Sequence, residues 1–488
     1  MHHRGPQLIT YADRLTGDVA GLTTLLDGPL AGAFSGVHVL PFYTPFDGVD
    51  AGFDPRDHTQ VDPRLGTWDD VRALAAGRTV MADVIVNHVS AGSAQFADVR
   101  DRGDESPWAP MFLTLGAVFP DGASEEDLAR IYRPRPGLPF TAMTLGGRRR
   151  LVWTTFTADQ VDIDLRTPQA WEYLDGVVDA LTAGGVRMLR LDAVGYTGKE
   201  AGTDCFMTPA TDEYTERIVA RARERGAEVL VEVHGHHTQQ IEIARKVDLV
   251  YDFALPPLVL HALTAVDLEP LDRWLRIRPA NAVTVLDTHD GIGIVDVGPS
   301  DLKPGEPGLL APEQIDALVE AIHEGSGGTS RLATGAAASN LDLYQVNCTF
   351  FDALGRDDSR YLLARMVQLF VPGIPQVYYV GLLAGSNDMD LLERTGVGRD
   401  VNRHHYTPVE IEEALGRPVV RSQLEALRLR AEHPAFEGAF SWTVDGSRAE
   451  LVWQAGQDRV GLVLDVADAT FEVRASGAEG DRVVVSSR

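Results

Sequence analysis

The chain has 488 residues, and its 71 acidic and 44 basic residues give a formal net charge of −27 at neutral pH. A field of that sign repels nucleic acids and anionic membranes, so we expect neither as a partner. Two cysteines, Cys205 and Cys348, are too few for a disulfide framework or a cysteine-based metal site. With no apolar leader and no long apolar stretch, the sequence favours a cytoplasmic protein.

Short runs rich in β-branched or aromatic residues recur along the chain, and most precede a segment with helical character. Eight such runs predict strands, at residues 7–12, 36–43, 79–88, 186–193, 228–234, 248–255, 281–290 and 374–380. Strands that alternate with helices form parallel sheets of the α/β class. Eight of them indicate a closed (β/α)8 TIM barrel, with a doubly wound open sheet as the alternative.

The connections between these strands are unusually long at two places. Residues 89–166 follow the third strand and residues 291–356 precede the eighth, and we expect both to be inserted subdomains that help to build a pocket. From residue 435 to 488, short alternating runs predict a small antiparallel β-domain. The barrel itself would then consist of residues 1–88, 167–290 and 357–434.

Charged side chains stand where several predicted strands end. Arg190 and Asp192 end the fourth strand, and they point to the same face because strand side chains alternate. Glu232 lies at the end of the fifth strand and Asp290 at the end of the seventh. The C-terminal ends of barrel strands surround the active site, so we expect these three carboxylates to converge on one pocket.

Two carboxyl groups with opposed proton affinities can cleave a glycosidic bond with retention. We expect Arg190 to keep Asp192 ionised as the nucleophile, and a neighbouring anion to raise the pKa of Glu232, the general acid. A divalent metal site with mixed histidine and carboxylate ligands is the other chemistry that such a cluster supports. The residue types are compatible with both glycoside cleavage and a metal site, and they favour glycoside cleavage.

Five short segments of the chain resemble the signature segments of the α-amylase superfamily, glycoside hydrolase family 13. They are DVIVNH (83–88), QVDID (160–164), RLDAVG (190–195), EVH (232–234) and THD (288–290). The resemblance implies that Asp192 is the nucleophile, Glu232 the general acid/base and Asp290 the stabiliser of the transition state. Gln160, which opens the second of these segments, is a further expected substrate-binding residue.

Longer segments resemble the sucrose phosphorylases within that superfamily, and they extend through both insertions. They include VLPFYTPFDGVDAGFDP (39–55), YRPRPGLPF (132–140) and TGAAASNLDLYQVN (334–347). The resemblance implies transfer of a glucosyl group from sucrose to inorganic phosphate through a covalent enzyme intermediate. It implies no cofactor and no metal, and it favours a homodimer.

The same resemblance assigns residues to the glucose side of the pocket. Asp50 and Arg399 would form an ion pair that closes the pocket, and Phe53 would provide an apolar platform for the sugar ring. Three further residues would bind glucose hydroxyl groups, namely His88, Arg190 and His289.

On the opposite side, Asp342 and Gln345 would suit the hydroxyl groups of a fructosyl unit. Phosphate requires cationic and hydroxyl groups near the acidic pocket. The candidates are Arg135, Tyr196, His234 and Tyr344. Because glycine and alanine surround this loop, we expect Asp342 and Tyr344 to alternate, one serving sucrose and the other phosphate.

The chain departs from the family pattern directly after the acid/base segment, where it reads Gly235, His236 and His237. We expect the two histidines to be solvated loop residues. The departure lies near the acceptor side, so the acceptor sugar stays open. Phosphorolysis of sucrose 6-phosphate or glucosylglycerol is one alternative, and a sucrose-acting transglucosylase or hydrolase is another.

Overall fold

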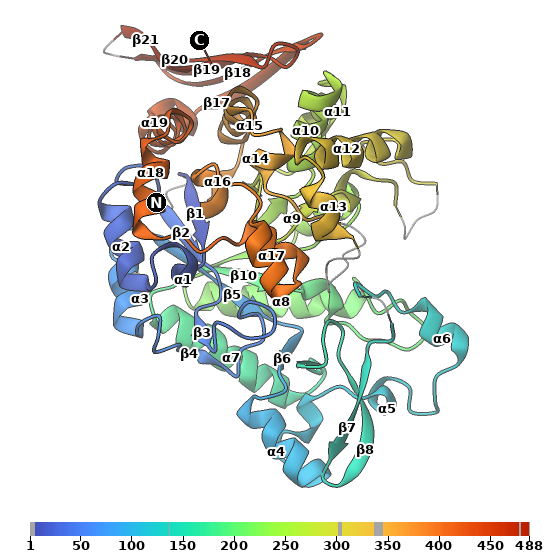
Figure 1. Ribbon diagram of the computed structural model, residues 1–488. Coiled ribbons are helices and arrows are strands. Elements are labelled where there is room, and N and C mark those ends of the chain that lie inside the picture. The colour runs from blue at the N-terminus through green and yellow to red at the C-terminus, as the bar shows by residue number, and fades with distance from the viewer. Residues whose placement is uncertain (1–4, 136, 301–304, 336–344, 478–479, 488) are drawn as a thin grey trace.

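The computed structural model describes residues 5–135, 137–300, 305–335, 345–477 and 480–487. At its centre, eight parallel strands close into a barrel (Figure 1). In chain order they are β1 (Gln7–Thr10), β2 (Gly36–Val39), β5 (Thr79–Ile85), β10 (Met188–Asp192), β11 (Glu228–Val231), β12 (Leu249–Asp252), β13 (Ala282–Thr284) and β16 (Ile374–Tyr378). The predicted barrel of eight strands is therefore confirmed, and the open sheet is excluded.

All eight strands end earlier than the sequence predicts, and after three of them the residues beyond the ladder, among them His88, Glu232 and Asp290, line a pocket. The barrel interior holds its own apolar cluster, which includes Met81, Leu230 and Tyr251. Helices cover the outside, and the longer ones are α2 (Val19–Asp27), α3 (Trp68–Ala75), α7 (Pro168–Ala183), α8 (Pro209–Glu224), α9 (His237–Ala244), α10 (Leu255–Ala265), α11 (Glu269–Ile277), α15 (Asp358–Phe370), α18 (Pro408–Gly416) and α19 (Pro418–Glu432).

Helix α7 illustrates how the sequence sets these outer elements. The Thr167 side chain accepts a hydrogen bond from the N–H of Ala170, and Pro168 occupies the first turn, where it loses no helical hydrogen bond. One face then buries Leu174, Val178 and other apolar residues against the barrel.

The first insertion lies beside the barrel in the lower part of Figure 1. Strand β6 (His88–Ser90) pairs with β9 (Gln160–Asp162), so both ends of the insertion are tied together at the pocket rim. Between them lie α4 (Ala94–Arg102), α5 (Leu115–Val118), α6 (Glu125–Arg130) and the hairpin of β7 (Phe140–Leu145) and β8 (Arg148–Trp153).

The second insertion is closed by a short antiparallel pair, β14 (Ile292–Gly293) with β15 (Gln345–Val346). It contains the 3-10 turn η4 (Val295–Val297) and the helices α12 (Pro312–Gly325) and α13 (Thr329–Thr334), and α14 (Phe350–Ala353) follows it. Its two strands bring residues 290–297 and residue 345 to the same side of the barrel mouth.

The C-terminal segment forms the expected antiparallel sheet, which packs over α15 and α19 (Figure 1). Its strands are β17 (Ala439–Asp445), β18 (Arg448–Ala455), β19 (Asp458–Asp465), β20 (Thr470–Gly477) and β21 (Gly480–Ser486). The buried indole of Trp453 donates to the carbonyl of Phe370 at 2.6 Å, which anchors the sheet to α15. The domain boundaries given above stay predictions.

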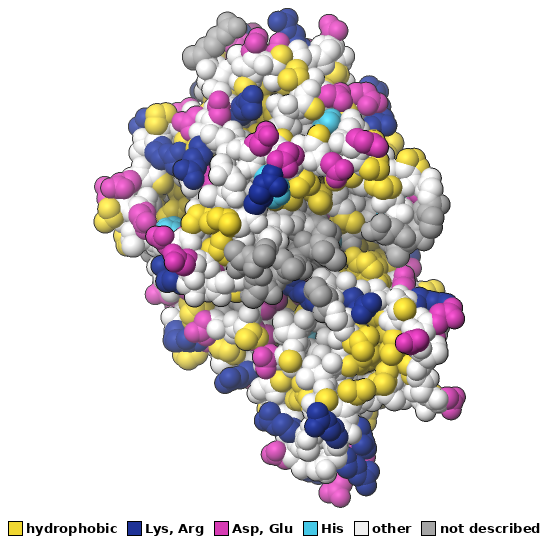
Figure 2. All heavy atoms as spheres, turned by 45° about the vertical axis from the view of Figure 1, so that its right-hand side comes forward, with side chains coloured by type: hydrophobic (Ala, Val, Ile, Leu, Met, Phe, Trp, Pro, Cys, Tyr) yellow, Lys and Arg dark blue, Asp and Glu magenta, His cyan; other side chains and the backbone are white. Residues whose placement is uncertain are grey.

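Acidic and basic side chains are intermingled over the face shown in Figure 2. Among the described residues, no helix is both long enough and apolar enough to cross a membrane.

Candidate active site

The floor of the pocket is organised by the buried guanidinium of Arg190. Its Nη1 lies 2.7 Å from Asp83 Oδ1 and 2.7 Å from Asp192 Oδ1, and its side chain is only 2% exposed. Arg190 and Asp83 are register partners on β10 and β5, so their side chains point the same way. His38 contacts the other oxygen of Asp83 at 2.9 Å. Burial raises the pKa of Asp83, but His38 and Arg190 outweigh it and hold the value at about 2.

Glu232 reaches the same guanidinium from the neighbouring strand. The register pairs Leu191 with Val231, and the Glu232 N–H extends this ladder by bonding to the Leu191 carbonyl at 3.2 Å. Asp192 and Glu232 are thus the next neighbours across strands that lie about 4.8 Å apart. A retaining displacement needs two carboxyl groups on neighbouring positions of one pocket, and this register places Asp192 and Glu232 on adjacent strands at its floor.

Two further contacts hold the Glu232 carboxylate in place. Its Oε1 lies 4.0 Å from Arg190 Nη2, and its Oε2 accepts a hydrogen bond of 3.2 Å from the Ala193 N–H. Ala193 is able to donate there because its backbone turns into the left-handed region, with φ at +57°. The strand therefore ends in a strained turn that directs both carboxyl groups into one pocket.

The pKa of Asp192 differs from the prediction that Arg190 keeps this carboxyl group ionised. Burial raises the pKa of Asp192 to about 8 and the charge of Glu232 adds to this, although Arg190 opposes it. The expectation of a low pKa is wrong for the free pocket, because desolvation exceeds the attraction of one shared arginine.

Asp290 is ionised in the same pocket. Burial raises its pKa, but the nearby guanidinium groups of Arg399, Arg190 and Arg403 together hold the pKa well below the usual range. Arg399 Nη1 contacts Asp290 Oδ1 at 2.7 Å. This contact differs from the predicted pair, in which Arg399 binds Asp50.

Asp50 instead accepts a hydrogen bond of 3.3 Å from Gln160 Nε2. Burial raises the pKa of Asp50, yet the charge of Arg399 and of other arginines lowers it overall. Arg399 thus acts on both carboxylates, and Gln160 lies in the pocket as predicted.

The glucose side also has an apolar platform. The rings of Phe53 and His289 stack at 4.9 Å with an interplanar angle of 6°. His88 Nε2 lies 3.0 Å from the Phe53 carbonyl, which ties the platform to the first insertion. Burial lowers the pKa of His289 to about 3 and also lowers that of His88, so both rings are neutral hydrogen-bonding groups at neutral pH.

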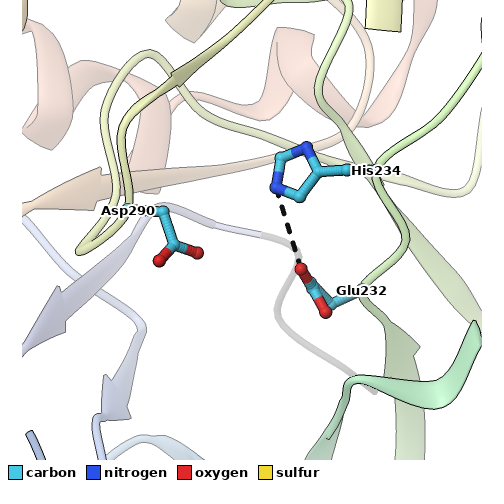
Figure 3. A group of neighbouring side chains, drawn as sticks. All are labelled: Glu232, His234 and Asp290. Atoms are coloured by element: carbon cyan, nitrogen blue, oxygen red, sulfur yellow. Dashed lines mark ion pairs between the residues drawn. The ribbon is translucent and has the colours of Figure 1, made fainter. Parts of the chain in front are cut away.

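The acceptor side centres on Glu232, His234 and Asp290, which face one another across the pocket (Figure 3). One polar atom from each lies within 4.8 Å of the others, and His234 Nε2 is 3.7 Å from Glu232 Oε1. By spacing alone these atoms could surround a cation. Because the guanidinium of Arg399 already neutralises Asp290, we assign the cluster to acid–base chemistry.

Most of the predicted site residues line this single pocket. The lining includes Asp50, Phe53, His88, Arg135, Gln160, Asp192, Tyr196, Glu232, His234, His289, Asp290, Gln345 and Arg399. Two predicted residues, Asp342 and Tyr344, lie outside the described part of the chain, so their alternation stays a prediction.

An aromatic wall of the pocket was not predicted from the sequence. It consists of Tyr132, Phe156 and Phe206, which surround the predicted Tyr196 at ring distances of 4.9–6.1 Å. Buried Lys199 supports this wall, since its ammonium contacts Asp162 at 2.7 Å and also donates to the Tyr196 carbonyl. The only indication of this arrangement in the sequence is Lys199 in the run RLDAVGYTGKE, a lysine that closely follows an apolar strand.

His236 and His237 correct the expectation of solvated loop residues, because they are only 5% and 7% exposed. His236 Nε2 lies 3.1 Å from the Pro307 carbonyl, and the His237 ring packs edge-on against Trp274. Both therefore fasten the acid/base loop to its surroundings instead of facing solvent.

A closed (β/α)8 barrel with three carboxylates at its C-terminal mouth is compatible with an enzyme that acts on glycosides. The family model for the alpha-amylase catalytic domain matches residues 10–253. A sucrose phosphorylase from Agrobacterium vitis is 56% identical over 96% of this chain and 97% of its own. One from Bifidobacterium adolescentis is 54% identical over 94% and 92%.

Among solved structures, a sucrose 6F-phosphate phosphorylase from Thermoanaerobacter thermosaccharolyticum superposes with a TM-score of 0.91 at 35% identity. The match covers 100% of this chain and 98% of the other. The chain belongs to the alpha-amylase family and, within it, to the sucrose phosphorylases.

Proposed function

We propose that this chain catalyses the phosphorolysis of sucrose to α-glucose 1-phosphate and fructose, with retention at the anomeric carbon. One observation carries the proposal: Asp192 and Glu232 are cross-strand neighbours that enter one pocket on either side of the Arg190 guanidinium. The pocket also contains Arg135 and His234, groups able to attract an anionic acceptor. No cofactor takes part in this scheme.

In the first half-reaction, Asp192 attacks the anomeric carbon while Glu232 gives its proton to the departing fructosyl oxygen. A covalent β-glucosyl ester of Asp192 forms. Asp290, which is fully ionised, stabilises the oxocarbenium-like transition state through glucose hydroxyl groups. The stacked Phe53 and His289 rings support the sugar, and Asp50 and Arg399 close its far end.

In the second half-reaction, an oxygen of hydrogen phosphate bonds to the anomeric carbon as the ester bond to Asp192 breaks. The electron pair returns to the Asp192 carboxylate, and the proton of hydrogen phosphate returns to Glu232. Two inversions at one carbon give net retention. Glu232 is less important in this half, because phosphate already carries negative charge.

The test measures fructose, glucose and glucose 1-phosphate released from sucrose with and without inorganic phosphate. We expect phosphate to divert the glucosyl group into glucose 1-phosphate, and we expect only the α-anomer by NMR. Fructose release that yields free glucose regardless of phosphate would overturn the proposal in favour of a hydrolase.

Parallel assays with sucrose 6-phosphate and glucosylglycerol decide the acceptor sugar. We expect sucrose to have the highest kcat/KM of the three. A higher value with either alternative would move the assignment to that α-glucoside and leave the chemistry at Asp192 and Glu232 unchanged.

We also propose that the chain works as a homodimer in the cytoplasm. Cys205 and Cys348 are buried free thiols, which suits a reducing compartment. Symmetric dimers are the commonest oligomers of soluble enzymes. Light scattering on the purified chain should give twice the mass of one chain, and the mass of a single chain would contradict the dimer.

A further inference from the structure

Asp296 is a fully buried carboxylate that directly contacts the acceptor side of the pocket. It lies in η4 of the second insertion, and its side chain is 0% exposed. Its Oδ2 is 3.0 Å from His234 Nδ1, while its Oδ1 accepts hydrogen bonds from the Gly235 N–H at 3.2 Å and from Gln240 Nε2 at 3.0 Å. A buried carboxylate with donors from His234, Gly235 and helix α9 orients the segment after β11, since burial without partners would cost several kcal/mol.

We infer that Asp296 is a positioning residue that holds His234 as a hydrogen-bond donor for inorganic phosphate, and that it thereby favours phosphate over water as the second substrate. The inference rests on the proposed function and names a determinant of its acceptor choice.

The contact with Asp296 fixes which nitrogen of His234 faces the pocket. Because Nδ1 donates to Asp296, Nε2 is the atom that points toward Glu232 Oε1, at 3.7 Å. The ring is also stacked on Phe253 at 4.0 Å, so it has little freedom to turn away. A carboxylate that orients an imidazole in this manner also stabilises its protonated form.

Gln345 supplies a second donor beside the first. Its carbonyl Oε1 accepts from the Gly291 N–H at 3.2 Å and from Arg399 Nη2 at 3.3 Å, which turns its amide nitrogen toward His234 Nε2, 3.3 Å away. Once His234 is protonated, its Nε2 and the Gln345 amide nitrogen are two neighbouring N–H donors at the pocket wall. A phosphate oxygen satisfies both with charge-assisted hydrogen bonds.

The charges that face the His234 ring come from three elements. They are Asp296 in η4, Glu232 after β11 and Asp290 after β13, and all three raise the pKa of His234 above its ordinary value despite burial. The imidazole is thus cationic to a higher pH than a free histidine.

The positive charge of the His234 imidazole has its largest effect in the second half-reaction. Glu232 has then lost its proton to fructose, so it repels an incoming anion but serves water well as a general base. A protonated His234 at 3.7 Å offsets the Glu232 charge and favours the anion. Without Asp296, we expect the glucosyl-enzyme to react more readily with water than with phosphate.

The test compares the full chain with Asp296→Asn, which keeps the shape of the side chain but removes its charge. We expect the KM for phosphate to rise at least about tenfold, the value of one pKa unit of lost stabilisation. The share of free glucose should rise with it, while the kcat for fructose release changes by less than about threefold. An unchanged ratio of glucose 1-phosphate to glucose would overturn the inference.

Gln240→Leu is the matched control, because it removes one hydrogen bond from Asp296 and leaves its charge in place. We expect its phosphate KM to stay within about twofold of the unmodified chain. If Gln240→Leu reproduces the effect of Asp296→Asn, loop packing rather than charge is responsible and the inference fails.

The dependence of the phosphate KM on pH distinguishes the loss of a charge from a loss of packing. In the unmodified chain, phosphate KM should rise as the pH passes above the pKa of His234. In Asp296→Asn this rise should begin at least about one pH unit lower, and an identical profile would contradict the inference.

A measurement on the native chain covers the case in which Asp296→Asn does not fold. The imidazole NMR signal that disappears in His234→Gln identifies His234, and we expect it to titrate above pH 6.5. Titration below that value would overturn the inference. If the unmodified chain forms no glucose 1-phosphate at all, the proposed function fails; if it does and the variant behaves identically, only this inference fails.

Discussion

The floor of the pocket and the side that surrounds His234 are built from different parts of the fold. Asp83, Arg190 and Asp192 lie on paired strands of the barrel, where the register fixes their neighbours. His234 follows strand β11, whereas Asp296 in η4 and Gln345 on the short strand β15 belong to the second insertion. Strand positions are rigid, whereas loop positions depend on side-chain contacts, so chemistry at the sugar carbon can stay constant while the acceptor changes.

The substitution with the largest expected effect removes Asp192, the proposed nucleophile. We expect Asp192→Asn to lower fructose release from sucrose by at least about 10⁴-fold, because no covalent intermediate can form. Loss should be equal with phosphate, arsenate and water as acceptors. Retention of more than about one per cent of the activity would mean that another residue attacks the sugar.

Removal of the acid/base should separate the two half-reactions. We expect Glu232→Gln to slow sucrose cleavage by about 10²–10⁴-fold, since the fructosyl oxygen then leaves without a proton. Azide should still attack a glucosyl-enzyme formed from α-glucosyl fluoride, whose leaving group needs little protonation. Equal loss with azide, phosphate and water would contradict the role of Glu232.

We also expect the removal of a charged side chain to destabilise the protein most at the barrel floor. We expect Arg190→Leu to lower the free energy of unfolding by about 3–5 kcal/mol, because the ionised Asp83 loses its cation in a buried site. Urea denaturation measures this difference. The control is Arg276→Leu, whose bidentate contact with Asp272 lies on an exposed helix face, and it should cost about 1 kcal/mol or less. Similar losses in the two variants would refute the contrast.

Sequence patterns identified the strand-end residues because periodicity and register decide where they point. Asp192, Glu232 and Asp290 each follow an apolar run, and a closed barrel brings such positions to one mouth. The pKa of Asp192 could not be predicted in the same way, because desolvation depends on how completely the pocket walls enclose the carboxyl group.

Asp296 and the aromatic residues of the pocket could not be predicted from the sequence, for a different reason. Asp296 stands between valines in IVDVG and carries no signal of its own, since only the folded insertion brings it to His234. Tyr132, Phe156 and Phe206 come from two separate regions of the chain and meet through loop packing. Contacts of this kind have no fixed spacing in sequence, so local patterns do not reveal them.

The smallest expected effect concerns the acceptor-side loop itself, at His237. Burial lowers the pKa of His237 to about 4, and the nearby His236 lowers it further, whereas an unfolded histidine titrates near pH 6.5. Between these values the unfolded chain binds the extra proton, so His237 costs stability as the pH falls through this range. His237→Phe preserves the edge-on contact with Trp274 and cannot take up a proton.

We therefore expect His237→Phe to be more stable than the unmodified chain at pH 5, by about 1 kcal/mol after allowance for the partial exposure of the ring. At pH 7.5 this titration term vanishes and the two should differ by no more than a few tenths of a kcal/mol. Urea denaturation at the two pH values measures the difference. A gap that does not change with pH would show that His237 has the same pKa in the folded and the unfolded chain, and the loop would then not exclude a charged ring as we expect.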